Sequence, residues 1–230
     1  MTLALTETAI CDRLVETLSA SDDGCSATFF REMFVQDFAR RADLVVANGT
    51  LSAFEIKSAR DSLDRLDGQL DVYAQHFEQV TVVAATRHVS AVLACVPRRV
   101  GIWEVTDDGQ LIVHRRATSR RIPKSKLLTF LPVDELRSLI RTTGKSVTGT
   151  RMDLLKAAQA VRYDSVREFV MRFMGRRTIR IQEKRQRRSD SARANTTLLL
   201  QRQDQEAKLA SYLAKISEAG TMRAIPRRVA

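Results

Sequence analysis

The chain has 230 residues, a hydrophobic content of 44% and a formal net charge of +11 at pH 7. The apolar content is enough for a globular core, and no run of about eighteen apolar residues exists that would span a membrane. The three cysteines lie far apart, which fits reduced thiols in a cytoplasmic protein better than a disulfide or zinc framework.

The charge is unevenly distributed along the chain. Residues 1–150 carry 19 basic and 19 acidic side chains, whereas residues 151–230 carry 19 basic and 8 acidic ones. The whole positive excess therefore lies in the last third. Such a segment favours a polyanion as partner, most commonly nucleic acid. A solvated tail that only aids solubility would have the same composition.

The N-terminal part is predicted to begin with a helix. Apolar residues at helical spacing predict this helix over residues 3–19, and the polar residues 21–26 then predict a loop. Residues 27–38 fit either a second short helix or an irregular approach to the strand that follows.

Two apolar runs around Asn48-Gly49 predict a β-hairpin. Asp43 opens its first strand, and Glu55 and Lys57 lie on its second. Since side chains alternate faces along a strand, a two-residue turn would place the two carboxylates on opposite faces. A three-residue loop or a glycine bulge would place them on one face. We therefore predict such a loop, and a divalent cation that balances both carboxylates.

A helix and a buried strand are expected after the hairpin. Ser58 or Asp61 can cap a helix that runs to about Phe77. Gln69 and Tyr73 are one turn apart on this helix, so both can reach the same neighbourhood. The β-branched run at residues 79–85 predicts a strand that is parallel to the second hairpin strand through a βαβ crossover.

The next segment predicts a short helix and a second hairpin. Residues 89–95 have the pattern of a helical turn before Pro97. The runs at residues 100–105 and 111–113 surround Asp107-Asp108-Gly109, which is typical of a turn between paired strands.

Several of these residues together resemble the signature of the PD-(D/E)XK nuclease superfamily, in a small bacterial and phage group with the RecB-like Gln-x-x-x-Tyr motif. The matching residues are Asp43, Glu55-Ile56-Lys57-Ser58, Asp61, Arg65-Leu66, Gln69 and Tyr73. The resemblance covers roughly residues 1–135, with Ala42 where the signature often has proline. It implies an α/β fold with a restriction-endonuclease-like core, that is, a mixed β-sheet flanked by helices in the order αβββαβ.

The resemblance also implies a magnesium-dependent deoxyribonuclease, in which Mn²⁺ can replace Mg²⁺. Asp43, Glu55 and the backbone carbonyl of Ile56 would hold the metal, because Mg²⁺ prefers oxygen ligands. The metal would acidify a bound water, and Lys57 would orient that water or bind the phosphate.

The same resemblance implies supporting roles for other side chains. Gln69 would position the water or a base edge, and Tyr73 would complete the catalytic group. Nucleases of this kind often add a carboxylate from an N-terminal element. Glu16 and Glu32 both qualify, and Glu32 is preferred.

A basic helical region at residues 127–230 is expected to follow a nuclease-like domain at residues 1–126. Within it, residues 136–155 resemble a SAP-type helix–loop–helix, a small DNA-binding module. Apolar residues within 196–217 favour a helix that docks either on a partner or on a second copy of the chain, which would form a homodimer. The basic side chains expected to contact nucleic acid are Arg176, Arg177, Arg180, Lys184, Arg185, Arg187 and Arg188.

The sequence thus favours a metal-dependent nuclease that acts on DNA rather than RNA, with no membrane partner. The alternative is a nucleic-acid-binding regulatory protein of bacterial or phage origin, on a nuclease-like fold without cleavage activity. A third interpretation is an interaction protein whose basic tail binds an acidic partner.

Overall fold

The computed structural model describes residues 5–21, 27–35, 40–145 and 148–177. The chain divides into two compact units, residues 1–178 and 179–230, and the second lies outside the described residues. The expected boundary at residue 126 falls inside the first unit, so the division into 1–126 and 127–230 stays a prediction.

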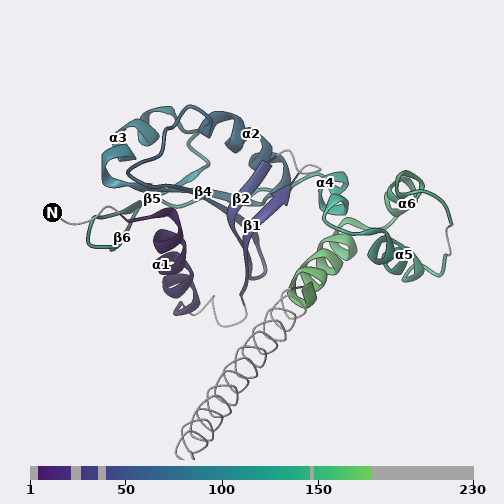
Figure 1. Cartoon of the computed structure of the whole chain (residues 1–230). Coiled ribbons are helices and arrows are strands. Elements are labelled where there is room, and N and C mark those ends of the chain that lie inside the picture. The colour runs from purple at the N-terminus through teal and green to yellow at the C-terminus, as the bar shows by residue number, and fades with distance from the viewer. Residues whose placement is uncertain (1–4, 22–26, 36–39, 146–147, 178–230) are drawn as a thin grey trace, which may run out of the picture. The chain divides into compact units, whose positions relative to one another are not determined.

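A six-stranded mixed sheet forms the centre of the first unit (Figure 1), and its strands lie side by side in sequence order. They are β1 (Thr28–Val35), β2 (Arg40–Ala47), β3 (Leu51–Lys57), β4 (Gln79–Ala85), β5 (Gly101–Val105) and β6 (Leu111–Arg115). The first three pair antiparallel, β4 and β5 continue parallel to β3, and β6 returns antiparallel. The parallel β3–β4 pair and the β5–β6 hairpin confirm the predictions for these segments.

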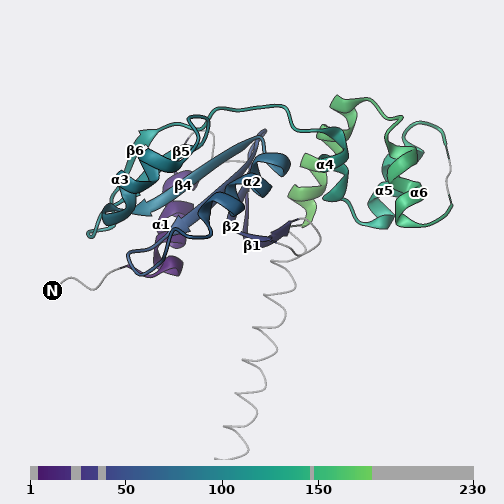
Figure 2. The same ribbon diagram turned by 90° about the horizontal axis from the view of Figure 1, so that it is seen from above.

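Helices cover both faces of the sheet (Figure 2). Those of the sheet region are α1 (Glu7–Ser19), α2 (Leu66–His76) and α3 (Thr86–Cys95). Ile10 and Leu14 of α1 pack on one face with Phe54. Leu70 of α2 and Val92 of α3 pack on the other face with Ala53. The first six elements follow the expected order αβββαβ, and the mixed sheet flanked by helices is confirmed.

Both expectations for residues 27–38 are wrong where the structure describes this segment. Thr28–Val35 form strand β1, which pairs with β2. Glu32 has a positive φ of 54°, and the buried positions change from Phe30 before it to Met33 and Val35 after it. Phe30 and Met33 are therefore buried three positions apart, which is the spacing of a helix and not the alternation of a strand. For this reason the sequence pattern does not predict the strand.

The start of α2 also differs from the expectation. The helix begins at Leu66, and its N-cap residue Arg65 makes no side-chain capping bond. Asp61 does not cap it, because its carboxylate accepts hydrogen bonds from the Ser58 amide at 2.7 Å and the Ser58 hydroxyl at 2.6 Å. The two residues instead close a turn between β3 and the helix.

The helical region after the sheet shares a core with it. Its elements are α4 (Lys124–Thr129), α5 (Val133–Arg141), α6 (Arg151–Ala158) and a helical segment at residues 163–177. α4 and α5 are separate helices because Pro132 cannot continue α4. Apolar side chains such as Leu131 and Val170 join the same buried cluster as Val82 of the sheet. None of the described helices has the length and apolar character needed to cross a bilayer.

A close approach at Gly101 gives a first prediction. A Cβ atom there would lie 2.7 Å from Oγ1 of Thr81 and 2.8 Å from the backbone nitrogen of Ala117. Gly101→Ala is therefore expected to lower the free energy of unfolding by about 1–3 kcal/mol, as measured by urea denaturation.

The matched control for this prediction is Gly68→Ala in α2. A Cβ atom at position 68 would meet only the Arg40 side chain, at 3.6 Å. Since alanine is the better helix former, this change is expected to be neutral or stabilising by up to ~1 kcal/mol. Equal costs at the two positions would contradict the steric argument.

Candidate functional site

The β2–β3 hairpin brings the predicted acidic residues together. Its last pair is Ala47 with Leu51, so residues 48–50 form a three-residue loop, and Gly49 takes a positive φ of 90°. The prediction of a three-residue loop is confirmed. Leu44 pairs with Phe54, so the same register places Asp43 opposite Glu55.

Glu55 and Lys57 form a buried, hydrogen-bonded ion pair with residues of α2. The two side chains belong to residues only 1% and 6% exposed, and Nζ of Lys57 lies 2.8 Å from Oε1 of Glu55. Gln69 donates its amide to the same oxygen and accepts from Lys57 at 3.0 Å. Such a pair is tolerated in the interior because both side chains also form hydrogen bonds with Gln69 of α2.

Tyr73 completes this network from the next turn of α2. Its hydroxyl oxygen lies 2.9 Å from Oε2 of Glu55 and 2.7 Å from the Arg41 carbonyl oxygen. Burial and the adjacent Glu55 carboxylate raise the pKa of the Tyr73 phenol, so it stays protonated and donates. Both oxygens of Glu55 are therefore engaged by side chains of the protein.

Asp43 lies beside this network but has a different environment. Its Oδ2 accepts the Ile56 amide proton at 2.7 Å. Burial and, next, the charge of Glu55 raise the pKa of Asp43 to about 8. At neutral pH the folded protein thus favours a proton on this carboxyl group.

This raised pKa predicts a pH-dependent stability. Unfolded, Asp43 has an ordinary pKa of 3.8, so it releases a proton that the folded state keeps. The free energy of unfolding of the wild type should therefore fall as pH rises from 3.8 to about 8. Asp43→Asn should weaken this decline and be more stable than the wild type at pH 8, by at least ~1 kcal/mol, in urea titrations at several pH values.

The control for the pH prediction is Asp71→Asn, which changes an exposed aspartate of α2. It should leave the pH profile of the wild type unchanged. The same profile in the Asp43 variant would contradict the protonation of Asp43 in the folded state.

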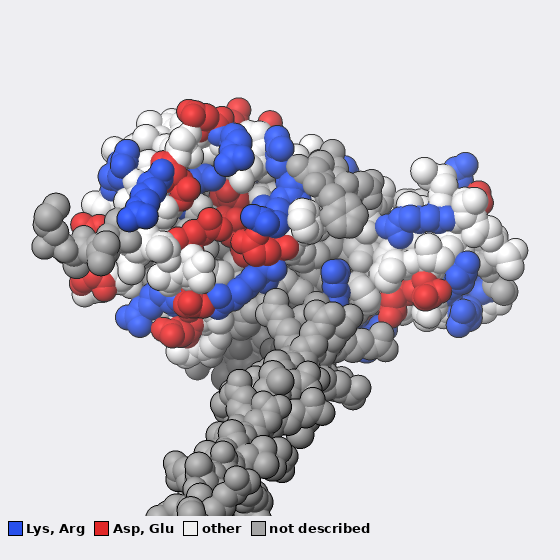
Figure 3. Space-filling view, viewed as in Figure 1, with Lys and Arg blue, Asp and Glu red and all other residues white. Residues whose placement is uncertain are grey.

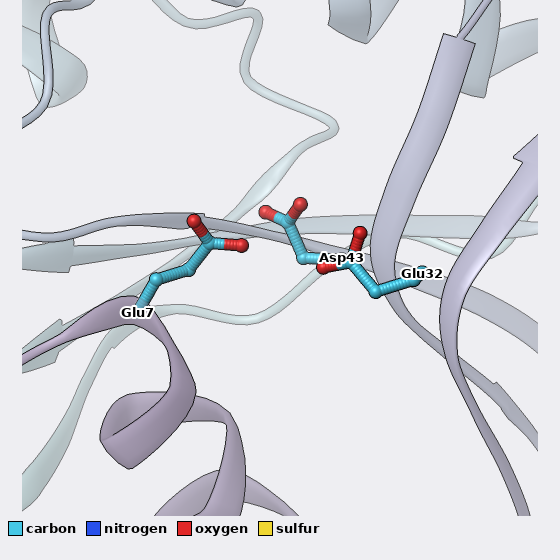
Figure 4. A group of neighbouring side chains, drawn as sticks. All are labelled: Glu7, Glu32 and Asp43. Atoms are coloured by element: carbon cyan, nitrogen blue, oxygen red, sulfur yellow. The ribbon is translucent and has the colours of Figure 1, made fainter.

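Three carboxylates meet at the edge of this site (Figure 4). Oxygens of Glu7, Glu32 and Asp43 all lie within 4.8 Å of one another. Glu32 falls opposite Asp43, between the pairs Arg31–Leu44 and Met33–Ala42, and its carboxylate forms an ion pair with Arg41. The preference for Glu32 over Glu16 agrees with this placement, since Glu16 is exposed on α1 beside Arg13, at 3.5 Å.

Glu7 is the member of the site that the sequence reasoning missed. It lies in the first turn of α1, and burial followed by the charge of Glu32 raises its pKa. Its position relative to Ile10, Cys11 and Leu14 is the helical i, i+3, i+4, i+7 spacing, which places the exposed Glu7 on the same side of α1 as these buried residues. That spacing is the signal that distinguishes it from Glu16.

The residues fit a hard cation, but with a different ligand set from the expected one. The expected set was Asp43, Glu55 and the Ile56 carbonyl, whereas both Glu55 oxygens bond to Lys57 and the α2 side chains. Asp43 instead has Glu7 and Glu32 as neighbours, and three carboxylates are the oxygen donors that Mg²⁺ or Mn²⁺ accepts. The presence of Mg²⁺ itself stays a prediction.

The site opens into a cavity of about 360 Å³ with a mixed rim. Its basic lining residues are Arg40, Arg41, Lys57 and Arg65, and its acidic ones are Glu7, Asp43, Glu55 and Asp61. Figure 3 shows acidic and basic side chains next to one another over this part of the molecule. The cavity wall is therefore polar and carries side chains of both charges.

The residues expected to contact nucleic acid are only partly described. Arg176 forms an ion pair with Glu135 of α5 at 3.0 Å, and its guanidinium lies 5.9 Å from the ring centre of Phe169. Arg177 lies on the rim of a cavity near Phe173. The others lie outside the described residues, namely Arg180, Lys184, Arg185, Arg187 and Arg188. The homodimer helix at 196–217 also lies outside them.

Comparison with known proteins assigns the chain to a phage family. A family model described as "Bacteriophage P4 protein cII" matches residues 2–199. The chain belongs to this family. Protein cII of Enterobacteria phage P4 is 37% identical over 164 residues, which are 69% of this chain and 62% of that protein. The chain thus spans less than two thirds of its relative's length.

One solved structure resembles part of the chain. It is a protein of unknown function from Silicibacter pomeroyi, with a TM-score of 0.41 and 17% identity, over 54% of this chain and 80% of that one.

Membership of the phage P4 cII family corrects the expected activity. The prediction of a magnesium-dependent deoxyribonuclease is wrong, because the family and the relative are named for protein cII and not for a nuclease. The resemblance to the PD-(D/E)XK superfamily and the SAP-like identity of residues 136–155 stay predictions. The phage origin named among the alternatives agrees with the family.

Proposed function

We propose that this member of the phage P4 cII family is a nucleic-acid-binding regulatory protein, with a nuclease-like core that does not cleave its partner. Its basic region provides affinity through phosphate contacts, with DNA favoured over RNA. The sheet region acts as a scaffold and as a polar binding surface.

The observation that carries this proposal is the separation of charge along the chain. Residues 151–177 contain seven basic and three acidic side chains, and residues 178–230 contain twelve and five. In contrast, residues 1–150 are balanced. A local excess of arginine and lysine favours binding to a phosphate backbone through release of counterions, without sequence preference.

The arrangement of the carboxylate site supports a binding role for the core. Lys57 and Glu55 form a hydrogen bond with each other and further hydrogen bonds with Gln69 and Tyr73 of α2. These bonds stabilise the packing of the hairpin against the helix. The cluster of Glu7, Glu32 and Asp43 remains as the place for a divalent cation. When bound, such a cation would neutralise these carboxylates and allow a phosphate to approach the cavity.

The proposal is tested with labelled duplex DNA, single-stranded DNA and RNA of one sequence. Fluorescence anisotropy should detect binding at about 50 mM salt that weakens steeply towards about 200 mM salt. The same oligonucleotides should remain intact on denaturing gels after incubation with Mg²⁺ or Mn²⁺.

Two outcomes would contradict the proposal. Metal-dependent cleavage that disappears in Asp43→Ala would mean that the core is catalytic. Failure to bind any of the three oligonucleotides at low salt would instead favour an acidic protein as partner of the basic region.

The cation is tested separately by thermal unfolding. Mg²⁺ is expected to raise the melting temperature of the wild type at pH 8, because it binds the folded cluster only. Asp43→Asn should lose most of this shift. An equal shift in both proteins would place the cation elsewhere.

A further inference from the structure

A second cavity lies between the sheet region and the helical segment at residues 163–177. Its volume is about 370 Å³, and it shares no lining residue with the carboxylate site. Its wall is formed by the loop before β4, the connection after β6 and the start of the helical segment. The lining residues are Glu78, Ser119, Arg120, Arg121, Tyr163, Asp164 and Arg167.

The acidic charge in this wall is largely balanced within the protein. Glu78 is only 6% exposed, accepts the Leu51 amide proton at 2.9 Å and pairs with Nε of Arg167 at 2.6 Å. Asp164 is exposed. Arg120 and Arg121 also line the wall, so its basic side chains outnumber its acidic ones.

Arg121 is available to a ligand. Among the described residues it has no hydrogen bond or ion pair, and its guanidinium carbon lies 3.7 Å from the centre of the Tyr163 ring. The stacking holds the guanidinium plane in place while its N–H donors stay unused.

Two polar atoms of the same wall are buried and lack hydrogen-bond partners within the described structure, namely Nε of Arg120 and the hydroxyl oxygen of Tyr163. Arg120 uses its other end to donate to the Ala74 carbonyl. Buried polar atoms almost always have partners, so two orphans in one wall indicate a ligand rich in acceptor oxygens. Tyr163 also opens a helical segment, whose first N–H groups have no partner within the helix and attract anions.

We propose that this cavity binds a phosphate group. Arginine N–H groups, a phenolic hydroxyl and a helix start are donors that match phosphate oxygens. The phosphate belongs either to a nucleic-acid backbone or to a free phosphomonoester, since both present the same oxygens. The site goes beyond the proposed function, because its residues lie outside the basic segment at 176–188.

The test is calorimetric titration of inorganic phosphate into the full chain. Arg121→Gln should weaken binding about tenfold, and Tyr163→Phe about threefold to tenfold, as expected for loss of one hydrogen bond to a charged group. Neither side chain forms a hydrogen bond among the described residues, so Tyr163→Phe should keep the wild-type melting temperature and Arg121→Gln should lower it only slightly, through loss of the contact with the Tyr163 ring. Arg98→Gln removes an exposed arginine outside the cavity and should bind phosphate like the wild type.

The outcomes separate this proposal from the proposed function. Absence of phosphate binding by the wild type, or unchanged binding by both cavity variants, would overturn it. Displacement of phosphate by an oligonucleotide without terminal phosphates would identify the backbone as the source, and displacement by a nucleoside monophosphate alone would identify a phosphomonoester. Loss of phosphate binding in Arg121→Gln, with oligonucleotide binding retained through the basic region, would support the cavity as a separate site.

Discussion

Replacing Lys57 by alanine is expected to lower the free energy of unfolding by about 3–5 kcal/mol. The change leaves Glu55, which is only 1% exposed, without its cationic partner. Among the described residues, Gln69 and Tyr73 are then the side chains that still donate to it. A buried carboxylate without a countercharge carries most of its desolvation cost uncompensated. Urea denaturation followed by the fluorescence of Trp103, the one tryptophan of the chain, measures the loss.

A double variant separates the charge effect from packing. Lys57→Met combined with Glu55→Gln removes both charges at similar volume, so it should recover most of the lost stability, to within ~1–2 kcal/mol of the wild type. Lys156→Ala, at an exposed position of α6, should change stability by no more than ~0.5 kcal/mol. A cost below ~1 kcal/mol for Lys57→Ala alone would mean that the ion pair does not hold Glu55 in the fold.

Neutralising the basic segment should produce the largest loss of nucleic-acid affinity. The variant replaces Lys184, Arg185, Arg187 and Arg188 with glutamine. If each contacts one phosphate, the slope of log affinity against log salt should fall by about 3–4 for duplex DNA, and affinity at low salt by on the order of a hundredfold. Fluorescence anisotropy at several salt concentrations measures both quantities.

The control for this variant has the same change in net charge elsewhere. It replaces four exposed arginines in the balanced part of the chain with glutamine, namely Arg60, Arg98, Arg99 and Arg116. Its affinity should stay within about threefold of the wild type, since only long-range attraction is lost. Equal losses in the two variants would show that overall charge, and not the basic segment, drives binding.

Local patterns predicted much of the sheet. The hairpin loop, the buried strand β4 and the β5–β6 hairpin follow from turn residues and from alternation, which report conformation over a few residues. Strand β1 was missed because the positive φ of Glu32 changes which side chains face the core. That segment forms a strand because it pairs with β2, and the periodicity of the sequence does not show this pairing.

The candidate site was predicted in part for the same reason. The alternation of side chains along a strand and the spacing of one helical turn depend on nearby residues. The sequence therefore predicted that Glu55 and Lys57 share a face and that Gln69 and Tyr73 reach the same neighbourhood, and the four side chains do lie together. Glu7 reaches Asp43 only because α1 packs across the sheet, over 36 positions of chain. The predicted deoxyribonuclease activity was wrong because the residue types of a short motif do not by themselves determine the function of the protein.

The amino-acid sequence by itself determined the faces of strands β2 and β3, the loop length of the hairpin that joins them and the separation of charge, because these depend on neighbours along the chain. Only the tertiary structure decided which carboxylates meet, that both oxygens of Glu55 are engaged, and that Arg120 and Tyr163 share a cavity wall. These features join segments far apart in the sequence, and their contacts arise from the packing of whole elements against one another.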